Sequence, residues 1–482
     1  MADEGATPAK VPFSVIDQAI HLLDVPTAPW SIQLEVRVEG HLDEARLRSA
    51  IAAGIGHHPM ARVRKLPSRL RAHVDHWCIE SEPAIDPLRV VECPDDESLT
   101  AARSRLQGIS VPLTESPPLR VLLARNPDGD VVMLNVNHAA MDGYGVLRLL
   151  RSIARAYSGE DDPIPPLNFE ETRHVAGNVK ARPWIRIRRQ LALTTRLRDL
   201  IVPPARVAGD GAADEAGYGF VHSSLTQTET KALVDGVKAM GGTDDDTRAT
   251  VNDALLAALH LAIADWNAQH EKACRRIGVL VPANLRPAEW REEVAGNFSL
   301  PARISTNRRQ RRSTVTALQA VAVQTRRKKQ VGMGTAFIEL LGRTRLLPLW
   351  AKRLFVLALP LTGNRLVDTA MLSNLGRLDI PPFGDGSGAG RVEEVWFSPP
   401  ARMPLGLTIG VATVDGRLYL VLRYRNRLFD DAAATRFAAL YARTLATFAA
   451  TDAVTTPATR SRSRSWSRSR SRSRSRKFLR AA

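Results

Sequence analysis

The sequence contains few cysteines, only Cys78, Cys93 and Cys274 among 482 residues. Their spacing matches no set of zinc or iron–sulfur ligands, so we expect no metal site. An odd and sparse set is typical of a reducing compartment, because secreted proteins stabilised by disulfides carry many paired cysteines.

Long apolar runs are also missing. The chain begins Met-Ala-Asp-Glu-Gly-Ala-Thr-Pro, which lacks the apolar core of a signal peptide. No segment reaches the roughly 20 apolar residues that a transmembrane helix needs. We therefore expect a cytoplasmic protein, with peripheral contact at a membrane or another anionic surface as a second expectation.

Two familiar catalytic signatures are absent as well. No glycine-rich loop precedes a helix in the manner of a nucleotide-binding site. No Gly-x-Ser-x-Gly nucleophile elbow is present either, so the sequence does not indicate a covalent acyl-serine intermediate.

Acidic residues are missing from the C-terminal end, where residues 460–476 alternate Arg and Ser around Trp466. Residues 460–482 hold nine arginines and Lys477, and so supply ten of the seventeen net positive charges. We predict that residues 451–482 are disordered, because this composition cannot bury an apolar core. The rest of the chain is only mildly basic, and we do not expect nucleic acid as a partner.

The most informative segment is residues 137–143, Asn-His-Ala-Ala-Met-Asp-Gly. It follows the alternating apolar residues 131–136, which predict a buried strand, and precedes apolar residues with helical spacing. A histidine in a tight turn between strand and helix can be held rigidly with one ring nitrogen facing a cavity. A general base needs this arrangement, so His138 is the candidate base. A purely structural histidine is the simpler alternative.

This segment resembles the His-His-x-x-x-Asp-Gly signature of the CoA-dependent acyltransferase superfamily. That superfamily includes chloramphenicol acetyltransferase, wax ester synthase/diacylglycerol acyltransferases and the condensation domains of nonribosomal peptide synthetases. Asn137 replaces the first histidine, and His138 corresponds to the family's catalytic second one. The resemblance implies that Asp142 is structural and pairs with an arginine, for which Arg286 is our candidate. The backbone amide of Gly143 is a candidate donor to the oxyanion.

Further segments match the family in its order along the chain, and resemble wax ester synthase/diacylglycerol acyltransferases most. An N-terminal strand and helix, ended by His58 and a proline, resemble the family's opening elements. Asn252 and Asp253 begin a predicted helix, with Asp253 in a capping box, and resemble the family's Asn-Asp helix. Ser373 and Asn374 resemble the element near the family's active-site tunnel. We therefore assign these four polar residues to the support of the site.

The resemblance implies an α/β (α+β) fold with two chloramphenicol-acetyltransferase-like lobes. Each lobe is expected to be a mixed β-sheet with helices, with an active-site tunnel between the two. A turn at Asp415-Gly416 predicts a hairpin in the second lobe. We divide the chain into a flexible N-terminus (1–11), an N-terminal lobe (12–160), a basic crossover (161–215), a C-terminal lobe (216–450) and a disordered Arg/Ser-rich tail (451–482).

Two segments carry hypotheses about contacts with partners. Residues 182–200 form a basic amphipathic pattern that suits a membrane surface, an acidic carrier protein or the phosphates of CoA. A surface helix packed by its apolar side explains the pattern equally well. Residues 346–359 are too short and too charged to span a bilayer. Two hypotheses remain for this segment: it forms a buried helix, or it forms an interfacial helix that borders the acyl site.

Together these features predict an acyl-CoA-dependent O-acyltransferase that transfers an acyl group from a thioester to a hydroxyl acceptor. We expect acyl-CoA as a co-substrate, no bound cofactor, and a lipid esterification of the wax ester or diacylglycerol type. One alternative is a free-standing condensation enzyme that takes acyl groups from an acyl carrier protein. A second is an inactive binding or scaffold homologue, for which Asn137 is the main support.

Overall fold

The structure is a computed structural model. It describes residues 9–25, 28–69, 71–163, 172, 202–211, 217–241, 248–290, 293–331, 341–358, 365, 367–384 and 390–449. Most of the predicted crossover, including the basic segment 182–200, lies outside these ranges. The predicted Arg/Ser tail lies outside them too, as does most of the predicted flexible N-terminus.

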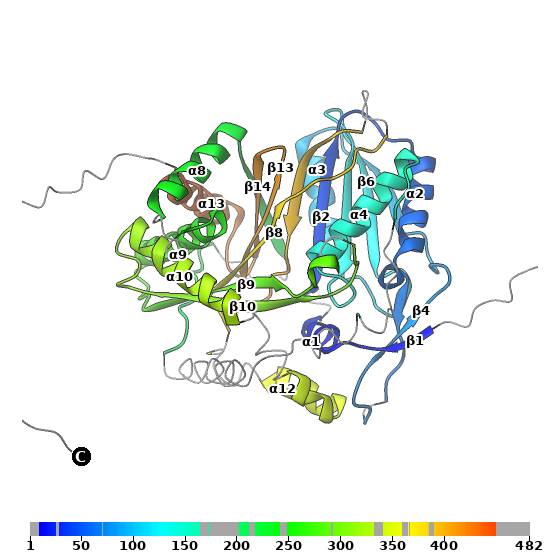
Figure 1. The fold of residues 1–482 in the computed structure, drawn as a ribbon, viewed down its shortest axis with the longest axis horizontal. Coiled ribbons are helices and arrows are strands. Elements are labelled where there is room, and N and C mark those ends of the chain that lie inside the picture. Colours follow the sequence, from blue (N-terminus) through cyan, green and yellow to red (C-terminus); the bar gives the residue numbers. More distant parts are fainter. Residues whose placement is uncertain are drawn as a thin grey trace, which may run out of the picture. The chain divides into compact units, whose positions relative to one another are not determined.

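The described part of the first lobe is built on a five-stranded sheet (Figure 1). In sheet order its strands are β12 (Val392–Ser398), β2 (Ser31–Val38), β7 (Val131–Asn137), β6 (Leu119–Arg125) and β5 (Leu88–Glu92). Neighbouring strands are antiparallel except β5 and β6, which are parallel. The sheet is therefore mixed, as the sequence predicted.

Helices pack on both faces of this sheet. They are α2 (Glu44–His57), α3 (Asp96–Gly108) and α4 (Gly143–Ser158). Successive residues of β7 point to opposite faces, as in any strand. Leu134 and Val136 belong to the core with α2 and α4, whereas Val131 and Met133 belong to a smaller core with α3. This two-sided burial explains why β7 is an almost unbroken apolar run.

Strand β12 comes from the C-terminal half of the sequence but completes the first sheet. Its residues pair antiparallel with β2, with Val395 opposite Val36 and Phe397 opposite Leu34. The residue pattern of 392–398 carries no information on which sheet this strand joins. One strand of the predicted C-terminal lobe is thus exchanged into the N-terminal sheet.

The described part of the second lobe contains a six-stranded sheet. In sheet order its strands are β10 (Ser299–Asn307), β9 (Arg276–Asn284), β11 (Ala370–Arg377), β13 (Leu407–Val414), β14 (Arg417–Arg425) and β8 (Tyr218–Leu225). The hairpin predicted at Asp415-Gly416 is confirmed, because β13 and β14 pair across it and both turn residues have positive φ angles of 46° and 73°.

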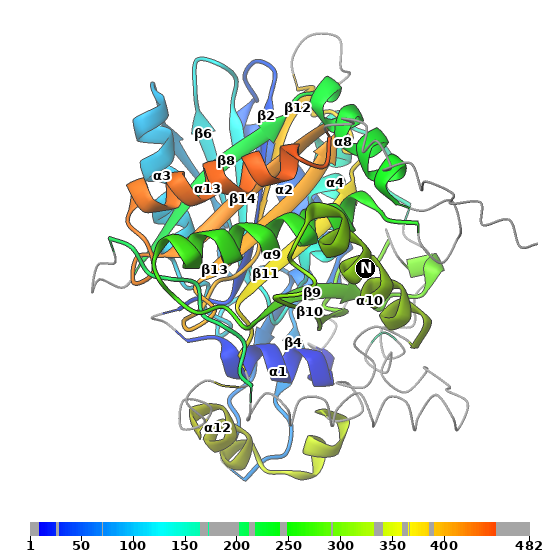
Figure 2. The same cartoon turned by 90° about the vertical axis from the view of Figure 1, so that its left-hand side faces the viewer.

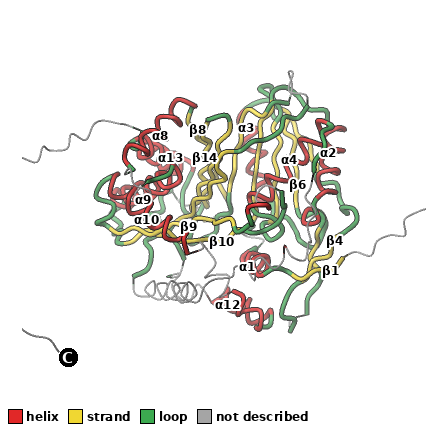
Figure 3. Tube along the Cα trace, in the orientation of Figure 1, coloured by secondary structure: helices red, strands yellow, loops and turns green. Residues whose placement is uncertain are grey.

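Helices cover this second sheet on its outer side, where α9 and α13 cross the strands (Figures 2 and 3). They are α8 (Gln227–Met240), α9 (Val251–Gln269), α10 (Thr314–Val331) and α13 (Asp431–Ala446). The predicted capping box at the start of α9 is confirmed: Thr250 accepts from the backbone amide of Asp253, and Asp253 accepts from that of Thr250.

A smaller layer lies beside the two large sheets. It contains β1 (Ala9–Pro12), β3 (Val63–Lys65), β4 (His76–Ile79), α1 (Val15–Leu23) and α12 (Leu349–Ala358). Phe13 stacks on Trp77, whose indole donates to the Asp17 carboxylate of α1 at 2.9 Å. No helix among the described residues is long and apolar enough to cross a membrane.

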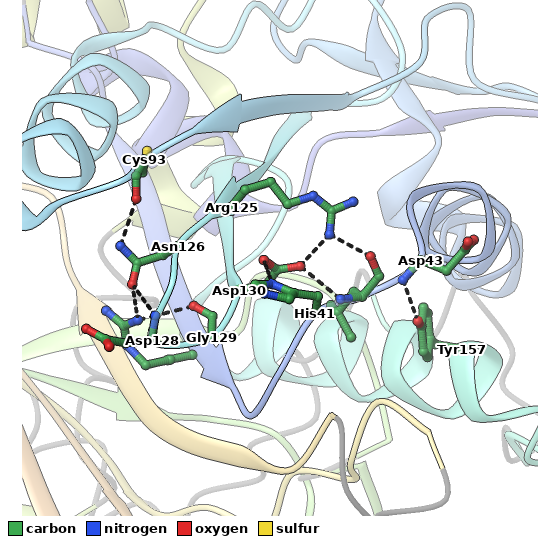
Figure 4. Close-up of polar contacts among 11 residues, drawn as sticks. His41, Asp43, Cys93, Arg125, Asn126, Asp128, Gly129, Asp130 and Tyr157 are labelled. Atoms are coloured by element: carbon green, nitrogen blue, oxygen red, sulfur yellow. Dashed lines mark hydrogen bonds and ion pairs between the residues drawn. The ribbon is translucent and has the colours of Figure 1, made fainter.

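A polar network fixes the end of β7 that lies away from the site (Figure 4). The buried carboxylate of Asp130 accepts from the backbone amide of Leu42 at 2.8 Å and pairs with Arg125. The Tyr157 hydroxyl of α4 accepts from the amide of Asp43, which caps α2. These contacts tie the β6–β7 turn, α2 and α4 together, and so hold the strand–turn–helix unit that carries residues 137–143.

Candidate active site

A cavity of about 640 Å³ lies between the two lobes. The end of β7 and the start of α4 form one wall, and strands β9, β10 and β11 of the second sheet form another. Most of the lining is apolar, with Ile32, Leu280, Leu300, Met371 and Phe397 among its side chains. His138 is one of the polar residues in the lining. The cavity can therefore accept an apolar group next to an imidazole.

His138 is held in place through its backbone. Its amide donates to the carbonyl of Trp30 at 2.9 Å, and its carbonyl accepts from the Asn297 side chain at 2.9 Å. The ring Nδ1 is buried and has no hydrogen-bond partner of normal geometry among the described residues. Since His138 lines the cavity, Nε2 is the ring nitrogen that a substrate can meet.

The environment of His138 favours the neutral imidazole. Burial lowers the pKa of His138 below its usual 6.5. The Asp142 carboxylate and the nearby carbonyls of His138 and Met141 oppose this shift without cancelling it. The ring is therefore uncharged near neutral pH and can accept a proton.

Asp142 and Arg286 form the buried pair that the sequence predicted. The two guanidinium nitrogens of Arg286 donate to the two carboxylate oxygens of Asp142, each at 2.8 Å, and both side chains are almost fully buried. The carboxylate also accepts from the amide of Gly145, the amide of Phe298 and the hydroxyl of Ser299. One side chain thus caps α4 and joins the first lobe to the β9–β10 hairpin.

Burial alone would raise the pKa of Asp142. The charge and hydrogen bonds of Arg286, with the amides of Phe298 and Gly145, outweigh burial and lower that pKa below 3.8. Asp142 is therefore ionised at neutral pH. Its five acceptor contacts leave it a positioning role in the turn rather than a role as a proton carrier.

Gly143 lets the start of α4 approach the second lobe closely. A Cβ atom at this position would lie 2.9 Å from the Leu375 side chain and 3.1 Å from Phe397. The amide of Gly143 is the first of α4, so no preceding helical carbonyl accepts from it. Gly143 lines the cavity, so its amide stays our candidate donor to a developing negative charge.

Asn137, which replaces the family's first histidine, is not among the residues lining the cavity. Its amide nitrogen donates to the Asp24 carboxylate at 2.8 Å and to the Val111 carbonyl at 2.9 Å. Its amide oxygen accepts from the backbone of Ala139 at 3.0 Å. Asn137 therefore shapes the turn from behind.

The four support residues predicted in the second half have different positions. Ser373 and Asn374 lie on β11 and line the cavity. Asn252 accepts from the Asn374 amide at 3.3 Å and so contacts the lining from behind. Asp253 caps α9 and is not among the lining residues. The structure brings three of the four to the cavity wall or directly behind it.

Three residues that position the site were not predicted from the sequence. They are Trp30, Asn297 and Ser299, which contact the backbone of His138 or the carboxylate of Asp142. Trp30 acts through its carbonyl, so no side-chain signal could identify it. Asn297 and Ser299 are far from residues 138–142 in the sequence, and only the hydrogen bonds of Asn297 to His138 and of Ser299 to Asp142 reveal their roles. Among the described residues, no cluster of His, Cys, Asp and Glu could hold a metal ion.

Comparisons with known proteins agree with this fold. No protein-family model matches the sequence. The chain is 36% identical to the uncharacterized protein Rv2305 of Mycobacterium tuberculosis over 445 residues, covering 90% of this chain and 99% of that protein. A stretch covering 31% of the chain is 27% identical to a dimodular nonribosomal peptide synthase of Bacillus subtilis, of which it spans 6%.

Two solved structures show the same architecture. The first condensation domain of the calcium-dependent antibiotic synthetase has a TM-score of 0.69 at 15% identity, covering 92% of this chain and 97% of that domain. The trichothecene 15-O-acetyltransferase of Fusarium sporotrichioides has a TM-score of 0.69 at 13% identity, covering 92% and 96%.

The fold is therefore that of the superfamily containing condensation domains and CoA-dependent acyltransferases, as the sequence predicted. Because the sequence similarity extends over nearly the whole length of both proteins, the chain belongs to the same family as Rv2305.

Proposed function

We propose that this protein transfers an acyl group from a thioester to a hydroxyl acceptor, with His138 as the general base. The observation that carries the proposal is an imidazole at the wall of a large, mostly apolar cavity, fixed by its backbone and by the Asp142–Arg286 pair behind it. Burial lowers the pKa of this imidazole and so favours its neutral form. The reaction requires no other residue of the site to gain or lose a proton.

The proposed chemistry is direct transfer. Nε2 of His138 takes the proton of the acceptor hydroxyl while its oxygen attacks the thioester carbonyl. The tetrahedral oxyanion accepts a hydrogen bond from the amide of Gly143. When the carbon–sulfur bond breaks, the imidazolium returns its proton to the leaving thiolate. The products are an ester, a thiol and the regenerated neutral histidine.

The finer proposal is that acyl-CoA is the donor, used as a co-substrate without a bound cofactor, and that the product is a lipid ester of the wax or diacylglycerol type. The apolar lining supports an apolar acyl chain or acceptor. The fold is shared with an O-acetyltransferase, which supports a hydroxyl acceptor.

A panel assay tests the proposal. Purified protein is incubated with acyl-CoAs of increasing chain length and with alcohols, diacylglycerol and amines, and products are identified by mass spectrometry. We expect esters, with turnover increasing toward longer acyl chains because more apolar surface enters the cavity. Formation of amides only, or no ester with any acyl-CoA, would refute the finer proposal.

A second candidate is condensation with acyl groups bound to a carrier protein. The condensation-domain neighbours and the partial match to a peptide synthase favour it. In the same assay, product formation with acyl-carrier protein but not with the matching acyl-CoA would identify this donor. If the protein binds acyl groups but forms no product with either donor, this result would support the remaining hypothesis, an inactive binding protein.

The pH dependence follows from the environment of His138. We expect kcat/KM to rise along an acid limb whose apparent pKa lies below 6.5 and then to level off. The sign follows because burial lowers the pKa of His138 and protonation removes the base, so activity is lost as the pH falls through that value. Rates measured between about pH 4.5 and 8 check this. An acid limb above 6.5 would contradict a desolvated histidine base.

A further inference from the structure

The short helix α12 exposes a row of large apolar side chains, here called the α12 row. It consists of Leu346, in the turn before the helix, and Trp350, Leu354 and Leu357, which are 83%, 51%, 58% and 73% exposed. Positions 350, 354 and 357 have the spacing of a single helix face. A contiguous exposed patch of this kind marks a surface that contacts a partner or a membrane.

The opposite side of α12 is fixed to the protein. The amide of Leu349 donates to the carbonyl of Ala72 at 2.8 Å, and Lys352 Nζ donates to the carbonyl of His73 at 2.6 Å. The His73 ring donates from Nδ1 to the carbonyl of Leu346 at 3.1 Å. Leu349 and Lys352 are both buried. These contacts hold the α12 row outward.

Exposed basic residues surround the α12 row. Arg343 precedes it in the sequence, Arg353 lies next to Leu354 within α12, and Arg69 and Arg71 lie in the loop to which the helix is bonded. Residues 341–358 contain no acidic residue, and the one acidic residue of that loop, Asp75, is buried and pairs with Lys65. An apolar centre with a positive rim matches an anionic lipid surface, because apolar side chains enter the acyl region while cations meet the headgroups.

We propose that the α12 row docks the protein on the surface of an anionic bilayer. Trp350 suits this contact, since tryptophan favours the boundary between headgroups and acyl chains. The helix also separates the docking surface from the cavity, because its residues Lys352 and Val356 line the cavity. Figures 1 and 2 both show α12 beside α1, which lines the same cavity.

Docking would place the apolar cavity next to the lipid phase. An apolar acyl donor or acceptor could then enter without crossing water. This consequence rests on the proposed function, whereas the docking itself does not. The sequence left a buried helix and an interfacial helix open for this segment. The exposure of the α12 row excludes complete burial, and the lining residues show that the helix borders the cavity.

Vesicle binding without substrate tests the proposal. The full chain is sedimented with vesicles of equal parts phosphatidylglycerol and phosphatidylcholine, at low and raised salt. A triple variant, Leu346→Ser, Leu354→Ser and Leu357→Ser, removes apolar surface from the row but leaves the lining residues intact. We expect its binding at raised salt to fall about tenfold or more, because insertion of apolar side chains is not screened by salt. Binding equal to that of the parent chain would overturn the proposal.

Two controls separate the α12 row from other contributions. A matched triple variant, Ile109→Ser, Val202→Ser and Val323→Ser, changes exposed apolar residues elsewhere and should bind as the parent does. A chain ending at residue 450 lacks the arginine-rich unit 451–482 and should lose binding at low salt only. A parent chain that binds no vesicles but retains an acidic protein through the same row would refute a lipid partner. Failure of the acyl-transfer assay would leave each of these results unchanged.

Discussion

His138→Ala is expected to fold normally and to lose acyl transfer by about 100-fold or more. Folding should survive because the contacts of His138 to Trp30 and Asn297 are made by its backbone, which alanine retains. The buried ring nitrogen contributes no hydrogen bond of normal geometry within the described structure. Initial rates at saturating substrate, with thermal unfolding curves on the same preparations, measure both effects. Full activity in this variant would refute the general-base mechanism.

Asn137→Ala, at the adjacent residue, is the control variant for that experiment. Its side chain makes three hydrogen bonds, to Asp24, Val111 and Ala139, and is not among the residues lining the cavity. Loss of these bonds should clearly lower the free energy of unfolding, whereas the rate of the chemical step should change only slightly. The two variants should therefore show opposite patterns: His138→Ala affects rate, and Asn137→Ala affects stability. If it is found, this contrast would argue against the idea that the missing first histidine makes the protein inactive.

The parts of the site that the sequence predicted are those with a local pattern. The alternation of residues 131–136, followed by a turn and a helical pattern, predicts β7 and α4 because strand and helix periods are read over a few residues. The hairpin at Asp415-Gly416 and the cap of α9 are local as well, and both are confirmed. The Asp142–Arg286 pair spans the two lobes, so local patterns could not provide it. It followed from the family resemblance.

The parts that the sequence did not predict depend on packing between distant segments. Strand β12 joins the first sheet, yet its apolar pattern would suit either sheet. Trp30 holds His138 through a carbonyl that every residue type possesses. The sequence of residues 346–359 left burial open, because an apolar residue can face a core or solvent until the neighbouring segments are placed.

The Asp142–Arg286 pair is expected to determine stability as well as activity. Asp142→Ala should lower the free energy of unfolding by about 3–5 kcal/mol, because it leaves the guanidinium of Arg286 buried without its partner charge. It also removes the cap of α4 and the contacts to Phe298 and Ser299, which loosens the turn that presents His138. Activity should therefore fall in the fraction that remains folded. Urea unfolding and initial rates measure the two effects separately.

A double-mutant cycle shows whether the two residues act as one unit. Replacing Arg286 by Met in the Asp142→Ala background removes the unpaired charge, so the double variant should be destabilised by clearly less than the sum of the single variants. Glu44→Ala is the control, because it breaks the exposed pair with Arg48 and should change stability by about 0.5 kcal/mol or less.

Since the pKa of Asp142 is lowered in the folded protein, the contribution of its carboxylate to stability is present at neutral pH. It should be lost only as the pH falls below about 3.8, through the pKa of the folded state. In the double-mutant cycle, strictly additive single effects would show that Asp142 and Arg286 act independently, and would refute the conclusion that this pair joins the two lobes as one unit.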